Sequence, residues 1–132
     1  MRWSVVNVKK YVFTKLSGST ALQTLIGSGQ VVDMYPNEVT VFPLVVYIDS
    51  NQSDNEYADN KPETSRASVT VHVFTKTLTG FPTTTSIGII IADIFKNLLW
   101  HCVSNGETPD PIDSVRHRVM IFSRDLFPSD LT

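Results

Sequence analysis

The spacing of hydrophobic and polar residues predicts a helix at the start of the chain. Apolar residues recur there at intervals of three and four, which is the period of an amphipathic helix. The predicted helix covers residues 4–16, with Ser4 as its N-cap and Ser17-Gly18 as its stop. A strand is the competing interpretation, because valine and phenylalanine lower intrinsic helix propensity. The apolar stripe consists of Val5, Val8, Val12 and Leu16.

Two more helices are predicted further along. A short one begins after Ser19 or Thr20, either of which can act as N-cap, and ends at Gly27. A second long helix begins among the threonines before Ser86 and continues to about His101. Its broad apolar face predicts that it is packed against a core. That face consists of Ile87, Ile90, Ile91, Ile94, Phe95 and Leu98.

Four segments have patterns typical of β-strands. Residues 30–35 form a short candidate, and residues 44–48 are continuously apolar, as in a strand covered on both faces. Residues 67–77 and 115–123 alternate between apolar and polar side chains, which is the period of a half-covered strand.

Two polar segments are predicted as loops. Residues 49–66 are too long for an ordinary hairpin connection, so they form either a functional arm or a flexible loop. Residues 104–113 contain Asn-Gly and two prolines. The predicted fold is therefore α+β: a mostly antiparallel sheet of about four strands packed by two main helices, with a long polar loop. Residues 1–132 are expected to form a single domain.

Charge is distributed unevenly along the chain. The net charge of −2 argues against non-specific nucleic-acid binding, and 42% hydrophobic residues allow a compact core. Every charged residue before Asp33 is basic, whereas residues 49–66 contain five acids and two bases. Opposite patches on one subunit suit head-to-tail contacts between identical subunits, although two solvated faces explain the pattern equally well. The early basic residues are Arg2, Lys9, Lys10 and Lys15.

The sequence predicts a soluble, intracellular protein without a membrane segment. No signal peptide is visible, and the longest apolar stretch, 87–100, is short and interrupted by polar residues. Cys102 is the only cysteine, so no internal disulfide is possible, and a reducing compartment fits.

No catalytic, cofactor or metal motif is recognisable. The nucleophile elbow, the phosphate-binding loop and the dinucleotide fingerprint are all missing from the sequence. His72 and His117 could meet across strands, but ordinary sheet residues are the favoured interpretation. Asp93 is expected on the exposed side of the second long helix. We therefore predict no catalytic residue, no bound metal and no cofactor.

Several short motifs follow one another along the chain in a characteristic order. The segments STALQTLIG, VVDMYP, FPLVVYID, VTVHVF and IADIFKNL follow the N-terminal helix in that order. The chain resembles the tail-terminator or tail-completion (head–tail joining) proteins of long-tailed bacteriophages. The resemblance reaches to about Trp100; the insertion at 28–30 and the segment 109–111 depart from the usual pattern.

The resemblance implies a structural virion protein rather than an enzyme. It implies a homo-oligomeric ring, usually hexameric, that ends the tail tube and joins it to the head connector. The implied partners are further copies of the chain, the tail tube protein and the neck proteins. DNA could pass through the ring without sequence-specific contacts. The implied location is the tail–neck junction of the virion, after assembly in the host cytoplasm.

Two alternatives remain open at the level of the sequence. One is a head-side neck or connector protein of similar size. The other, from a different class, is a small α+β enzyme or ligand-binding protein with a pocket lined by His72, His117 and Asp93. Terminal aromatic residues are further candidates for subunit contacts. The expected interface residues are Lys9, Lys10, Lys15, Asp54, Glu56, Asp59, Glu63, Arg116, Arg118 and Phe127.

Overall fold

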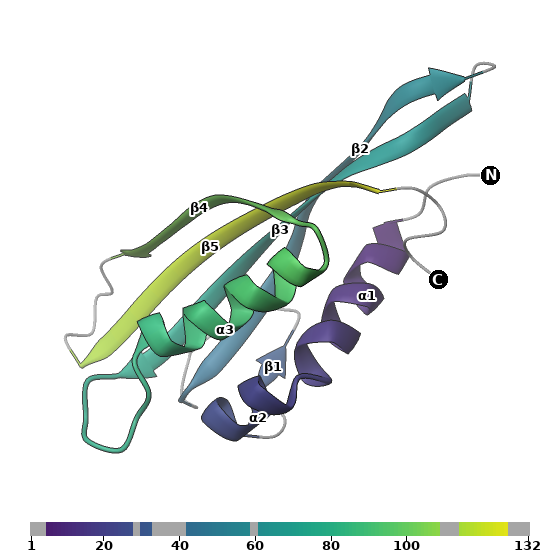
Figure 1. Ribbon diagram of the computed structural model, residues 1–132. Helices are drawn as coiled ribbons and strands as arrows, with labels where there is room; N and C mark the ends of the chain where they lie inside the picture. The colour runs from purple at the N-terminus through teal and green to yellow at the C-terminus, as the bar shows by residue number, and fades with distance from the viewer. Residues whose placement is uncertain (1–4, 28–29, 33–41, 59–60, 109–113, 127–132) are drawn as a thin grey trace.

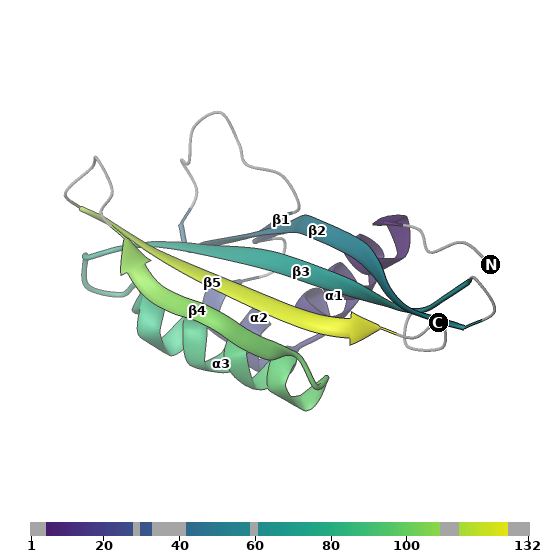
Figure 2. The same ribbon diagram turned by 90° about the horizontal axis from the view of Figure 1, so that it is seen from above.

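The computed structural model describes residues 5–27, 30–32, 42–58, 61–108 and 114–126. They form a five-stranded sheet with three helices on one of its faces (Figures 1 and 2). The predicted α+β class is confirmed, with five strands instead of about four. The elements in chain order are α1 (Val5–Ser17), α2 (Thr20–Ile26), β1 (Val31–Val32), β2 (Leu44–Ala58), β3 (Lys61–Lys76), α3 (Thr84–Asn97), β4 (His101–Thr108) and β5 (Val115–Leu126).

The strand order in the sheet is β1-β2-β3-β5-β4. Only the β1–β2 pair is parallel, with Val31 opposite Val45. The other neighbours run antiparallel, and β3 lies at the centre of the sheet between β2 and β5. The two edges are therefore the short β1 and the strand β4.

The core lies between the sheet and the helices. Val69, Val71 and Val73 alternate along β3 and are fully buried, as their period-two pattern predicts. Phe95 of α3 stacks on Phe122 of β5, with 4.2 Å between ring centroids. The buried helix residues that complete this core are Val12, Leu16, Leu22, Ile26, Ile87 and Ile91.

The first two helices agree with the sequence prediction. The proposed cap Ser4 lies outside the described residues, but α1 has the predicted extent. Ser19 caps α2, because its hydroxyl accepts a hydrogen bond from the backbone N–H of Leu22 at 3.3 Å. Gly27 ends α2 with φ of 89°, a conformation that favours glycine. Residues 33–35 of the predicted strand 30–35 lie outside the described residues, and β1 is the part that is seen.

The prediction of a helix to about His101 is wrong, and so is the predicted loop over residues 104–108. Helix α3 ends at Asn97, Leu99 turns the chain with φ of 68°, and β4 begins at His101. Most β4 side chains are exposed, because this strand lies at the edge of the sheet. Without a covered face it has no hydrophobic alternation, so its Asn-Gly pair was misinterpreted as a turn signal. Residues 109–113 lie outside the described residues.

The prediction of a long loop over residues 49–66 is also wrong, because strands β2 and β3 run on through it to Ala58 and from Lys61 (Figure 1). Cross-strand backbone hydrogen bonds hold such a hairpin whatever its side chains are. Because backbone pairing does not require alternating apolar side chains, the polar sequence of this segment shows no strand periodicity. The described part of this segment is therefore a β-hairpin.

Candidate assembly surfaces

The end of the β2–β3 hairpin extends beyond the sheet. Strand β5 pairs with β3 only from Ser65 onward, and Ser65 lies opposite Asp54 of β2. Further out, the described strands pair only with each other. We call the segments 54–58 and 61–65 the distal hairpin. Figure 1 shows it reaching past the ends of the other elements.

Several of the predicted interface residues fall on this hairpin. The sequence-predicted acids Asp54 and Glu56 lie on β2, and Glu63 lies on β3. Asp59 falls outside the described residues. With Lys61 as the one base between residues 54 and 65, the sequence of this arm is net acidic.

The predicted basic helix is α1. Lys9 and Lys10 lie in its first half, and Lys15 is an exposed residue of its last turn. The Lys15 ammonium lies 5.8 Å from the centroid of the Tyr11 ring, which is a cation–π arrangement. Lys15 thus remains on the surface, although its charge is partly engaged by an aromatic ring of its own helix.

The other predicted arginines lie on β5 and differ in their surroundings. Arg118 donates hydrogen bonds to Asn105 Oδ1 at 2.9 Å and Thr85 Oγ1 at 3.0 Å. Gly88 of α3 permits this approach, because a Cβ at that position would lie 3.0 Å from Arg118 Cδ. Arg118 therefore ties β5 to β4 and α3 within the subunit. Arg116 is exposed, and Phe127 lies outside the described residues.

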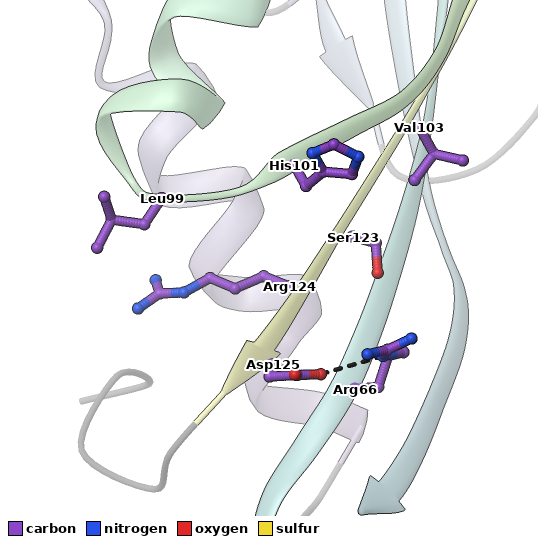
Figure 3. A pocket seen from close by; sticks show the side chains of 7 residues that line it. All are labelled: Arg66, Leu99, His101, Val103, Ser123, Arg124 and Asp125. Atoms are coloured by element: carbon purple, nitrogen blue, oxygen red, sulfur yellow. Dashed lines mark hydrogen bonds and ion pairs between the residues drawn. The ribbon is translucent and has the colours of Figure 1, made fainter.

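A basic pocket of about 440 Å³ lies near the base of the distal hairpin, where β3, β4 and β5 meet the turn after α3 (Figure 3). Arg66 forms an ion pair with Asp125 at 3.0 Å, and the bond to this carboxylate raises the pKa of the Arg66 guanidinium. Arg124 donates a hydrogen bond to the carbonyl oxygen of Leu98 at 2.7 Å. The pocket is lined by Arg66, Leu99, His101, Val103, Ser123, Arg124 and Asp125.

Sequence reasoning missed this pocket. Arg66 and Asp125 are 59 positions apart and meet only because the β3–β5 register places them opposite each other. His101 was expected in a helix and lies on β4 instead. The sequence does place an arginine at one end of each alternating segment, Arg66 before residues 67–77 and Arg124 after residues 115–123. That pattern does not show that the two ends lie side by side in the sheet.

The two histidines meet across strands, as the sequence allowed. His72 Nδ1 lies 2.9 Å from His117 Nε2, and the His117 ring stacks on Phe74 with 4.2 Å between centroids. Burial and the nearby His117 lower the pKa of His72 to about 4. This pair lies on the sheet face opposite the helices, as strand alternation requires. Asp93 is exposed on α3, so the three residues do not line a common pocket.

The described part of the chain gives no cluster of three His, Cys, Asp or Glu side chains suited to hold a metal ion. Within the same residues, no helix combines the length and the apolar character required to cross a membrane.

These features define a small α+β fold with a net acidic β-hairpin that extends beyond its sheet. Residues 10–94, well over half of the chain, match the family described as tail completion protein gp17. The chain belongs to this family, and it is accordingly a structural tail completion protein of a phage-like virion and not an enzyme. The resemblance inferred from the order of motifs is confirmed.

A solved structure has the same fold. It is a chain from the virion of a native gene transfer agent particle, and the TM-score is 0.67 at 12% sequence identity. The alignment covers 96% of this chain and 99% of that one, so the likeness extends over the whole fold. No curated protein sequence matches the chain.

Proposed function

We propose that copies of this protein form a ring, most simply a hexamer, that caps the last disc of the tail tube and joins it to the head connector. The ring stops tube growth on one side and offers a docking surface to the neck proteins on the other. Its partners are its own neighbours in the ring, the tail tube protein and the connector. DNA passes through its centre without sequence-specific contacts.

The distal hairpin is the observation that carries this proposal. A two-stranded ribbon without a covering layer is marginally stable in water by itself. An arm of this kind gains stability when it packs on another chain. Because the arm and the surface that receives it differ, the contact is heterologous and closes into a ring when the rotation per subunit divides a full turn.

Charge and edge strands support the same arrangement. The acidic arm and the basic helix α1 carry opposite charge, which orients subunits and suppresses wrong pairings. Strand β4 is an edge of the sheet among the described strands, and its mostly exposed side chains are available for contact with a neighbouring copy. The residues that we propose for the contacts are Lys9, Lys10, Lys15, Asp54, Glu56, Asp59, Glu63, Arg116, Arg118 and Phe127.

Electron microscopy of a lysate from the source virus with this gene disabled tests the proposal. Overlong or unjoined tails beside full heads are the expected result. Tails of normal length that fail to attach would favour a head-side connector instead. Intact virions would refute both assembly roles.

A shortened hairpin tests the role of the arm. Replacing residues 55–64 by a two-residue turn removes only strand pairs beyond the reach of β5. We expect a folded protein, checked by circular dichroism, that fails to complement the disabled gene. Reversing charge at Lys9 and Lys10 tests the basic helix in the same assay. Full complementation by the shortened chain would contradict the role of the arm.

A further inference from the structure

We propose that the basic pocket receives the distal hairpin of a neighbouring copy. The inference rests on the proposed ring, since it states which surface of one subunit accepts the arm of the next. The pocket is the one lined by Arg66, Leu99, Arg124 and their neighbours in Figure 3.

The charge of the pocket suits an acidic partner. Two arginines, Arg66 and Arg124, and one acid, Asp125, line the pocket, so its lining has an excess of positive charge. Figure 3 shows the two guanidinium groups on opposite sides of β5. The Arg66 and Asp125 side chains are 60% and 42% exposed. An ion pair this exposed contributes little to folding, so a carboxylate from another chain can share Arg66 at small cost. The distal hairpin is the most acidic segment of the sequence and provides such carboxylates.

The pocket also offers apolar surface. Leu99 and Val103 are 75% and 58% exposed, and both line the pocket beside the cationic groups. Figure 3 shows Arg124 extending to the same side of β5 as Leu99. A partner that covers them removes apolar area from water, which stabilises the contact. The sequence of the distal hairpin places one aromatic residue, Tyr57, among its acids.

The backbone features argue for side-chain docking rather than for addition of a strand. Pro62 on the distal part of β3 has no N–H to give to a further strand. The β4–β5 register shifts between Cys102 and Ser104, which places a bulge at Val103 on the edge strand. Prolines and bulges are features that prevent edge-to-edge pairing. We therefore infer that the hairpin contacts the pocket through side chains and does not add a strand to the edge of the sheet.

Geometry allows the arm to reach a neighbour and not its own pocket. The hairpin extends away from the body of its subunit (Figure 1). The pocket lies near its base, because its residues Arg66 and Asp125 form the strand pair next to Ser65 and Leu126. Residues 55–58, which lie beyond the end of β5, span roughly 13 Å at the rise of an extended strand. An arm at one end and a pocket at its base give each subunit one donor surface and one acceptor surface, as a head-to-tail ring requires.

Cross-linking through Cys102 tests the contact. Cys102 is the only cysteine of the chain, it is exposed, and it lies on β4 between His101 and Val103 of the pocket. An Ala58→Cys variant adds a second thiol at the end of the distal hairpin. Treating tails assembled with this variant with a short bismaleimide should give a ladder of covalent oligomers that ends at the ring size. The same thiol placed by Thr79→Cys, at an exposed position just past the opposite end of β3, should give no ladder.

A charge variant separates pocket recognition from mere proximity. In the Ala58→Cys background, Arg66→Gln should lower the yield of the ladder severalfold. Lys96→Gln, which removes the same charge from the exposed face of α3, should leave the yield unchanged. Equal yields from the two variants would refute recognition by the pocket.

The outcomes distinguish this inference from the proposed function. Rings visible by microscopy, without a ladder between the Ala58→Cys thiol and Cys102, would overturn the pocket contact and leave the ring standing. A ladder from Ala58→Cys to Lys15→Cys in a Cys102→Ser chain would assign the arm to the basic helix instead and would also overturn it. Tails without any ring of this protein would overturn the proposed function itself.

Discussion

Lowering the pH from 7 to 4 should destabilise the fold, and replacing His72 by phenylalanine should remove part of that loss. His72 is half-buried on the face of the sheet opposite the helices, with its Nδ1 2.9 Å from His117 Nε2. Burial first, and His117 second, lower the pKa of His72 to about 4. In an unfolded chain a histidine has a pKa of about 6.5.

The direction of the effect follows from proton binding. Between pH 6.5 and pH 4 the unfolded chain holds a proton on His72 and the folded chain does not, so the free energy of unfolding rises with pH in this window. The stabilisation is therefore complete above pH 6.5 and is lost as the pH falls toward 4. A full difference of 2.5 pH units corresponds to roughly 3.4 kcal/mol. Because solvent reaches part of the ring and screens its charge, we expect about 1 to 2 kcal/mol.

Urea unfolding followed by tryptophan fluorescence at pH 7, 6, 5 and 4 measures this effect. Phenylalanine keeps an aromatic ring beside Phe74 but binds no proton, so His72→Phe should show a shallower pH dependence by that amount. His101→Phe, the same change at an exposed histidine of β4, should retain the wild-type slope. Equal slopes for wild type and His72→Phe would refute the reasoning.

Three further substitutions test the core, the caps and the turns by the same urea measurement. Leu16→Ala should cost about 2 to 5 kcal/mol, because Leu16 is fully buried and its removal leaves a cavity; a loss below about 1 kcal/mol would contradict its place in the core. Ser19→Ala should cost about 0.5 to 2 kcal/mol, through the lost cap to the Leu22 N–H. Gly27→Ala should destabilise the protein by about 1 to 2 kcal/mol more than Gly106→Ala, because Gly27 has a positive φ and Gly106 does not. Equal costs at the two glycines would refute the argument from φ.

The family membership and the covered elements of the fold could be predicted from the sequence. Helices α1 and α3 and strand β3 pack against the core, so burial imposes on their side chains the periods of 3.6 and 2. Ser19 and Gly27 marked the ends of α2 because capping and positive φ are local requirements. The order of these same elements gave the resemblance to tail completion proteins, which the match over residues 10–94 confirmed.

Only the tertiary structure revealed the exposed strands and the contacts between residues far apart in the sequence. The distal hairpin and β4 are strands because neighbouring backbones pair with them, and backbone pairing leaves no pattern in exposed side chains. The basic pocket depends on the register that places Arg66 opposite Asp125. A shift of one residue would turn these side chains to opposite faces. Local sequence thus determined which segments face the core, and long-range strand pairing determined the surfaces proposed for assembly.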